Sequence, residues 1–315
     1  MFRYTTITRL RQEGFTETEL PAPDALLLIA EASGYLSDAL GQWFTPVRSQ
    51  KILDGMGSAL LYLPNRVPIL EVLSLAQIST ASASRPFLVP DKVDILLASG
   101  PNDMAVFDSS DYQVYGRYLE LLYSEFFGGR GNVLFDCYSG WMDTFSARSG
   151  TTRRILTDTT TLISNGGIDA ILTSISGFQA RDVVLFEKND SGREVLGQVI
   201  VNSIDVGNKK LVFDAIETKD AQQLPVGTRV LTFGAIPRLI ERATLLLVKR
   251  LNIRINTDDY DDAVMAGKIK SEKTDRYSYT LFGDADGGGV GLTGDYFVDR
   301  QLSYYAEPQI HVDFA

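Results

Sequence analysis

The spacing of apolar residues predicts two long helices, one in each half of the chain. The first follows Pro21-Ala22-Pro23, where Asp24 can cap a helix, and Gly41 ends it. The second begins after Pro237, a residue that suits the first turn of a helix. Their apolar faces contain Leu26, Ile29, Ala30, Ser33, Leu36 and Leu40 in the first helix and Leu239, Ile240, Ala243, Leu246, Leu247 and Leu251 in the second. We expect Trp43 and Phe44 to pin the end of the first helix to the core.

Between these helices the pattern is mainly that of β-strands separated by turns. Two short apolar runs flank Asp54-Gly55-Met56-Gly57, which predicts a hairpin because glycine supplies the positive φ of a tight turn. Further strands are predicted at residues 69–78, 93–97, 112–122 and 132–138. After a polar linker at residues 145–161, four more are predicted at 182–188, 194–204, 210–216 and 229–233. Their even spacing is typical of a small barrel or sandwich.

The sequence therefore predicts an α+β fold: a core of few helices with antiparallel hairpins and sheet, plus an inserted small all-β domain. The expected boundaries are 1–145 for the N-terminal part of the core and 146–235 for the linker and inserted domain. Residues 236–315 then complete the core with the late helix, an acidic segment and the C-terminal tail.

Counting residues excludes several kinds of chemistry. One cysteine, Cys137, rules out an internal disulfide framework and a Cys-based zinc site, and one histidine, His311, leaves no His-rich metal cluster. The sequence has no dinucleotide-binding or P-loop glycine motif. We therefore expect no catalytic residues, no cofactor and no metal. The absence of a long apolar run favours a soluble chain without a targeting segment.

The negative charge of the chain is concentrated near its end. The formal charge is −10, from 30 basic and 40 acidic residues, whereas residues 257–315 alone hold 12 acidic and 5 basic residues, a balance of −7. This balance disfavours a protein that wraps duplex DNA, because neutralising phosphates requires clustered Lys and Arg.

Several features allow both a chemical and a structural interpretation, and in each the structural one is favoured. Residues 284–295 resemble a calcium loop with poor ligands at positions 5 and 12, so a flexible loop is preferred. Residues 258–262 could gather a cation, although acidic residues also favour a helix start. Residues 149–154 could touch phosphate or form a solvated linker. Cys137 is expected to be a buried structural thiol, and His311 a surface residue.

The order of several motifs is more informative than any one of them. Residues 8–15 and the helix with Ile29-Ala30-Glu31-Ala32-Ser33 precede the exit Trp43-Phe44-Thr45-Pro46. Next come Leu53-Asp54-Gly55-Met56-Gly57, Leu61-Tyr62-Leu63-Pro64 and Pro68-Ile69-Leu70-Glu71-Val72, and later Asp111-Tyr112, Gly131-Asn132-Val133, Gly140 and Ile236-Pro237. This succession resembles head-tail connector proteins, also called adaptor or head-completion proteins, of tailed bacteriophages. It covers residues 1–140 and 236–315, and the β-rich insertion and long aromatic tail depart from it.

The resemblance implies a structural virion protein of the neck, at the head-tail junction, assembled in the host cytoplasm. It implies a ring homo-oligomer, a dodecamer, below the portal protein, which extends the DNA channel for packaging and ejection and docks the tail or further neck proteins. DNA would pass without sequence-specific binding, and no membrane is involved. An acidic channel wall is compatible with this role because it repels phosphate.

Two other function classes stay open. A β-rich virion or surface module could bind carbohydrate or a receptor through Trp43, Trp141 and the tyrosines. A carboxylate-dependent hydrolase would need two acidic side chains about 5 to 9.5 Å apart.

The C-terminal tail is the predicted contact with the portal or another partner. Aromatic residues bury much area at a small entropic cost, which suits a segment that orders on a partner. Alternatively, these aromatic residues pack on the chain's own core. The predicted contact residues are Tyr296, Phe297, Tyr304, Tyr305 and Phe314.

Overall fold

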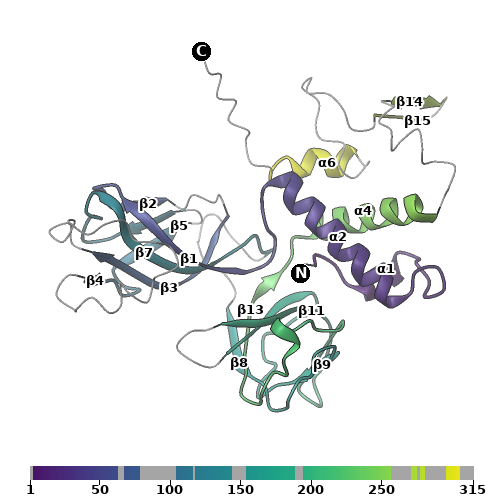
Figure 1. The fold of residues 1–315 in the computed structure, drawn as a ribbon, viewed down its shortest axis with the longest axis horizontal. Coiled ribbons are helices and arrows are strands. Elements are labelled where there is room, and N and C mark those ends of the chain that lie inside the picture. Colours follow the sequence, from purple (N-terminus) through teal and green to yellow (C-terminus); the bar gives the residue numbers. More distant parts are fainter. Residues whose placement is uncertain are drawn as a thin grey trace. The chain divides into compact units, whose positions relative to one another are not determined.

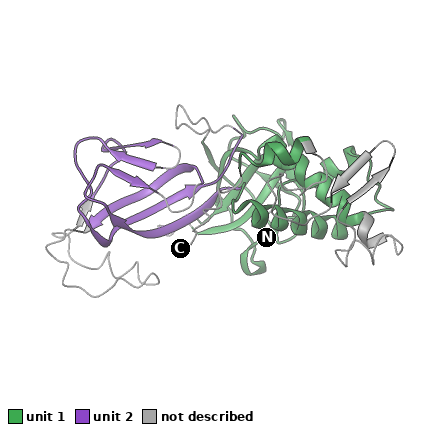
Figure 2. Ribbon diagram, turned by 90° about the horizontal axis from the view of Figure 1, so that it is seen from above, with its two compact units in different colours: residues 1–44, 154–315 green, residues 45–153 purple. Residues whose placement is uncertain are grey.

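The computed structural model describes residues 3–62, 67–78, 104–115, 118–143, 154–188, 194–256, 271–274, 277–280 and 296–305. Its contacts divide the chain into two compact units, coloured green and purple in Figure 2. Unit 1 comprises residues 1–44 and 154–315, and unit 2 comprises residues 45–153. This grouping differs from the predicted domain boundaries. Those boundaries concern which blocks fold independently, so they stay a prediction.

Unit 1 contains the helices, of which two are long (Figure 1). The described helices are α1 (Ile7–Gln12), α2 (Ala22–Leu40), η3 (Lys219–Ala221), α4 (Arg238–Asn256) and α6 (Tyr296–Leu302). Both predicted long helices are confirmed, and α2 and α4 pack against each other. Gly41 ends α2 in the left-handed conformation with φ 61°, as a C-terminal glycine does. The prediction that Asp24 caps this helix is wrong, because Pro21 is the N-cap and Asp24 lies within the first turn. Proline is tolerated at the start of a helix because the first N–H groups have no acceptor within the helix.

Six of the β-strands of unit 1 form an antiparallel sheet that closes on itself. Its strands are β8 (Ile155–Asp158), β9 (Asp169–Ile171), β10 (Asp182–Glu187), β11 (Val195–Asp205), β12 (Lys210–Phe213) and β13 (Arg229–Ala235). Their order is β8-β13-β10-β11-β12-β9, and the bridge from Thr159 to Leu172 joins the two edges. Apolar side chains including Val184, Phe186 and Phe213 fill the interior. The predicted all-β region is thus confirmed as a small barrel.

Two barrel strands were not predicted. Strand β8 lies in the stretch expected to be a polar linker, and β9 lies in a region with no predicted strand. Both are short and contain polar residues, so the pattern of apolar positions that would predict a strand is weak. They are strands because they pair with β13 and β12, which are far away in the sequence.

Unit 2 consists of two antiparallel sheets around a shared apolar cluster that includes Leu61, Leu75 and Phe135. One sheet has the order β1-β7-β3-β4, and the other β2-β6-β5. The strands are β1 (Val47–Gly55), β2 (Leu60–Tyr62), β3 (Ile69–Ile78), β4 (Met104–Val106), β5 (Tyr112–Tyr115), β6 (Tyr118–Leu121) and β7 (Gly129–Ser139). The predicted strands at residues 69–78 and 132–138 are confirmed, and the one at 93–97 lies outside the described residues.

Two predictions about strand pairing in unit 2 are wrong. The strands on either side of Asp54-Gly55-Met56-Gly57 do not form a hairpin, because β1 pairs with β7 and β2 pairs with β6. Gly55 is required by this distant pairing: its N–H donates to Asn132 Oδ1 at 2.7 Å, and a Cβ would lie 2.0 Å from the Phe127 carbonyl oxygen. The single strand predicted at residues 112–122 is instead the pair β5 and β6. A local turn signal marks a break in a strand, but partners distant in sequence decide the pairing.

The C-terminal part of unit 1 also differs from expectation. A two-stranded sheet is formed by β14 (Ser271–Thr274) and β15 (Tyr277–Thr280). Residues 296–298 begin α6, although aromatic and β-branched residues favour strands. Val298 and Leu302, four residues apart, are both buried, and α6 contacts α4. Tertiary packing along a helical face outweighs the local preference.

Candidate functional site

The predicted contact segment is a short helix with one buried and one exposed side. Val298 and Leu302 are 4% and 2% exposed, so they anchor α6 within unit 1. Phe297 and Tyr304 are 75% and 71% exposed. Phe297 lies on the anchored helix and Tyr304 two residues after its end. Exposed rings held in this way can contact a partner without the loss of entropy that ordering a free segment would cost.

Tyr305 has a different role from Phe297 and Tyr304. Its ring meets Phe44 edge-on at a centroid distance of 5.3 Å, and Phe44 in turn meets Tyr4 edge-on at 5.5 Å. Burial raises the pKa of Tyr305 and that of Tyr4, so both phenols keep their protons at neutral pH. Tyr305 therefore packs on the chain's own core. Of the two aromatic residues predicted to pin the end of α2, Phe44 is fully buried and does so, whereas Trp43 is half-buried.

Of the remaining predicted contact residues, Tyr296 is the first residue of α6, and Phe314 lies outside the described residues. The structure thus separates the five residues by environment. Phe297 and Tyr304 form the exposed part of the segment, which we call the α6 face. Whether any of the five contacts a partner stays a prediction.

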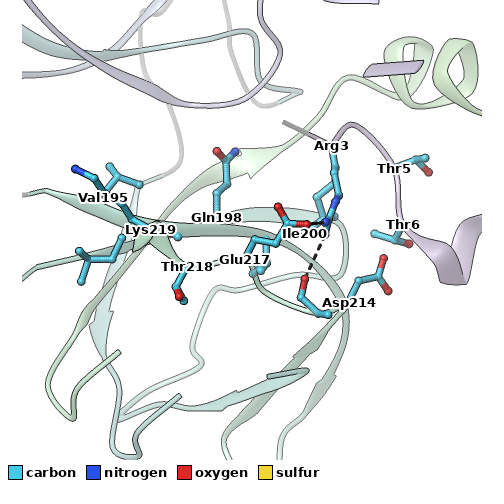
Figure 3. A pocket seen from close by; sticks show the side chains of 14 residues that line it. Arg3, Thr5, Thr6, Val195, Gln198, Ile200, Asp214, Glu217, Thr218 and Lys219 are labelled. Atoms are coloured by element: carbon cyan, nitrogen blue, oxygen red, sulfur yellow. Dashed lines mark hydrogen bonds and ion pairs between the residues drawn. The ribbon is translucent and has the colours of Figure 1, made fainter. Parts of the chain in front are cut away.

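A small pocket lies where the N-terminal residues meet the barrel (Figure 3). Its volume is about 320 Å³, and its lining includes Arg3, Thr5, β11 and the residues after β12. Arg3 is ion-paired with Glu217 and donates to the Ala215 carbonyl oxygen at 3.2 Å. The Ile7 N–H donates to Asp214 Oδ2 at 2.8 Å. These bonds attach the N-terminal segment to the barrel.

A larger groove lies along α1 and α4, with a volume of about 1150 Å³. Five cationic and three acidic residues line it, together with Phe15, Leu245 and Leu246. The cations are Arg9, Arg181, Arg238, Arg242 and Lys249, and the acids are Glu13, Glu19 and Glu241. We call this the α1/α4 groove. It holds an excess of positive charge in a chain whose formal charge is −10.

Glu241 is the buried centre of this groove. Its carboxylate accepts from Arg181 Nε at 2.9 Å and lies 3.3 Å from Arg9 Nε, while its side chain is 9% exposed. Two guanidinium groups thus compensate one buried carboxylate, as a buried charge requires. Three further cations of the lining, Arg238, Arg242 and Lys249, lie at exposed positions of α4. With 3.6 residues per turn, they lie within about 40° of one another around the helix axis.

The groove is not predicted by the local sequence pattern. Its one local signal is the spacing of the three cations of α4, four and seven residues apart, which places them on one face. Arg9 and Arg181 come from distant parts of the sequence, so only the folded chain brings them beside Glu241.

Cys137 is fully buried in unit 2, as predicted. Desolvation raises the pKa of its thiol to about 11, although the Ser49 hydroxyl at 3.8 Å lowers it slightly. A thiol with that pKa is almost entirely protonated at neutral pH and therefore a poor nucleophile.

Several other candidates lie outside the described residues: the calcium-like loop 284–295, the acidic residues 258–262, residues 149–153 and His311. Within the described ranges, no group of three or more His, Cys, Asp or Glu residues is placed to hold a metal ion. Among the helices that the structure describes, none has the length and apolarity needed to cross a membrane. Trp141, proposed as a stacking platform for sugars, is 7% exposed and hence unsuited to that role.

Comparisons with known proteins do not assign this chain to a family. No protein-family model matches the chain, and no curated protein matches it significantly. Among solved structures, the chain is similar to one from the neck of an empty GTA particle computed with C6 symmetry, at 13% identity and a TM-score of 0.27. The aligned region covers 44% of this chain and 65% of that chain. A likeness this low supports no conclusion about shared function.

Proposed function

We propose that this protein is a structural neck protein of a tailed bacteriophage, a head-tail connector that assembles into a ring below the portal. The ordered motifs along the sequence support this proposal. Several of them form the elements expected of them: α2 with its glycine end, β3, β7 and α4. The proposed location is the virion, and the proposed role is to extend the DNA channel and to dock the tail or further neck proteins.

The α6 face is the proposed attachment to the portal, and it is the observation that carries the proposal. Val298 and Leu302 hold the helix on unit 1 while Phe297 and Tyr304 expose most of their rings. Exposed aromatic side chains on a fixed element are the residues that protein interfaces enrich. In this proposal Tyr305 supports α6 through Phe44 and does not itself contact the partner.

The proposal assigns the chain no catalytic reaction and no cofactor. A mechanical role needs a shaped, self-associating surface and no reactive group. DNA would pass without sequence-specific contacts, and the acidic balance of the chain favours sliding because it repels phosphate.

Two measurements test the proposal. Negative-stain microscopy and mass photometry of the purified chain should show rings, and twelve copies are expected. Cosedimentation with purified portal rings should fall at least tenfold for the double variant Phe297→Ser and Tyr304→Ser. Tyr123→Ser is the matched control because Tyr123 is 86% exposed in unit 2. A chain that stays monomeric at all concentrations, with and without portal, contradicts the ring, and undiminished binding by the double variant contradicts the α6 contact.

A further inference from the structure

The sheet β2-β6-β5 of unit 2 has one buried and one accessible face. Its buried face contributes Leu61, Leu119 and Leu121 to the apolar cluster of this unit. Because the side chains of a strand alternate between the two faces, the residues that alternate with these leucines point the other way. None of them is buried, and we call them the tyrosine face. The pairing of the strands sets them in two rows, Tyr62, Tyr118 and Tyr115 in one and Leu60, Glu120 and Gln113 in the other.

The three tyrosines form a continuous row of rings across three strands. The rings of Tyr62 and Tyr118 have centroids 5.6 Å apart and planes tilted by 40°, and those of Tyr115 and Tyr118 have centroids 5.1 Å apart and planes within 17°. Carbon atoms in contact are about 3.5 to 4.0 Å apart, so nearly parallel rings with this larger centroid distance are offset. Each ring therefore leaves part of its face uncovered, and Tyr62 is 57% exposed.

Glu120 and Gln113 place hydrogen-bonding groups beside the rings. They lie directly opposite each other on β6 and β5. The Gln113 amide can both donate and accept, whereas the Glu120 carboxylate accepts. Desolvation and the neighbouring Glu120, which accepts from the Tyr115 hydroxyl, raise the pKa of Tyr115, so this phenol keeps its proton. The face thus combines flat apolar area with both donors and acceptors.

This combination selects a neutral ligand with many hydroxyl groups. One face of a sugar ring carries C–H groups, which are attracted to the negative face of an aromatic ring, while its hydroxyls both donate and accept. The six described residues of the tyrosine face include one carboxylate and no cation, so they offer no partner to the phosphates of a nucleic acid. A cage for an ammonium group needs rings around a common centre, whereas Tyr115 and Tyr118 stack on each other.

We propose that the tyrosine face binds a linear neutral oligosaccharide. Its successive sugar rings would stack along Tyr62, Tyr118 and Tyr115, and its hydroxyls would bond to Glu120 and Gln113. A row of rings across the width of a sheet matches a chain of sugars better than a single sugar. The inference goes beyond the proposed structural role and does not depend on ring assembly, because all six residues lie within unit 2 of one chain.

The test uses saturation-transfer difference NMR with the full-length protein and three neutral trisaccharides: cellotriose, maltotriose and triacetylchitotriose. At least one of them should receive saturation, and calorimetry then gives its Kd. Tyr62→Ala and Tyr118→Ala should each weaken binding by about fivefold to tenfold, as expected for the loss of one stacked ring. Tyr118→Phe, which keeps the ring, should bind nearly like the wild type. Tyr123→Ala is the matched control because Tyr123 is 86% exposed in the same unit and lies outside the row.

Three outcomes overturn the inference: no saturation of any of the three trisaccharides, equal binding by Tyr62→Ala and the wild type, or equal weakening by Tyr118→Phe and Tyr118→Ala. If Tyr118→Ala fails to fold, as judged by circular dichroism, Tyr62→Ala still tests the row because its ring is exposed.

Ionic strength separates this ligand from a basic protein partner. Trisaccharide binding should be unchanged as NaCl rises from 50 to 500 mM, because the ligand carries no charge. A triarginine peptide that binds at these tyrosines at low salt only, while no trisaccharide binds, would assign the face to a basic partner and overturn the inference. Sugar binding by a chain that forms no rings would contradict the proposed function alone.

Discussion

Arg181 and Glu241 form an ion pair that joins the turn before β10 to helix α4, with Arg181 Nη2 2.7 Å from Glu241 Oε2. Arg181 has φ 76°, a conformation that costs a non-glycine residue free energy. The same guanidinium also donates to the Ile236 carbonyl oxygen at 3.3 Å. This pair, with Arg9 on the other side of the carboxylate, links α1, α4 and the barrel within unit 1.

The first prediction follows from that pair. Glu241→Ala removes the carboxylate and leaves two partly buried guanidinium groups facing each other. We expect a loss of about 2 kcal/mol in the free energy of unfolding, below the usual cost for fully buried pairs because Arg9 and Arg181 are partly exposed. Urea denaturation measures it. Glu194→Ala, which breaks the pair with Lys219 in which both side chains are exposed, is the control and should cost less than about 1 kcal/mol.

The second prediction concerns the aromatic contacts at the end of α2. Phe44 is 0% exposed and packs edge-on against Tyr4 and Tyr305. Phe44→Ala should lower the free energy of unfolding by about 3 to 5 kcal/mol through lost burial and a cavity. Tyr304→Ala, at an exposed ring, should change it by less than about 0.5 kcal/mol. Comparable losses for the two variants in chemical denaturation would be inconsistent with this packing.

The third prediction separates anchoring from attachment in the C-terminal segment. Truncation after Gly289 removes α6 and with it the buried side chains of Val298 and Leu302. At about 1.5 to 3 kcal/mol for each buried apolar side chain, thermal unfolding should occur at a clearly lower temperature. Replacing Phe297 and Tyr304 by Ser should leave the melting temperature nearly unchanged. A truncated chain that melts like the full-length chain would show that α6 contributes nothing to the core.

The fourth prediction concerns pH and Cys137. The pKa of its thiol is raised to about 11 in the folded state, so this group contributes stability that is fully present below its unfolded pKa, near 9. That contribution is lost as pH rises from about 9 through 11, by about 2 to 3 kcal/mol in total. The difference in unfolding free energy between the wild type and Cys137→Ala should shrink over this range. A difference independent of pH would show that the thiol is not desolvated.

The fifth prediction concerns the inserted domain. Residues 154–236 contain all six strands of the barrel and its apolar interior. Expressed alone, this fragment should fold cooperatively, since its core does not depend on the helices. Circular dichroism and dispersed amide signals in NMR spectra measure this. If the fragment folds only when a peptide of residues 1–12 is added, the prediction is wrong. The contacts of Arg3 and Ile7 with the barrel would then be required for its folding.

The sequence by itself determined the elements whose signals are local. Helix α2 has an apolar face and a terminal glycine, and α4 begins after a proline. Strand β3 is mainly apolar, and β10 contains a continuous apolar run. For such segments, burial of one face or of the whole segment contributes most to the free energy of folding. The apolar residues that are buried therefore recur with a regular spacing in the sequence. The burial of Cys137 could be predicted for the same reason, because it lies in a mainly apolar run.

Only the tertiary structure decided what depends on partners distant in the sequence. Strand β1 pairs with β7, and at the end of this pairing Gly55 allows a close approach to the Phe127 carbonyl, which no local turn signal specifies. Residues 296–302 form a helix because Val298 and Leu302 can be buried together, although their intrinsic preference is for a strand. The ion pairs of Glu241 unite three segments that are about 60 to 230 residues apart, and contacts at such separations leave no periodic trace in the sequence.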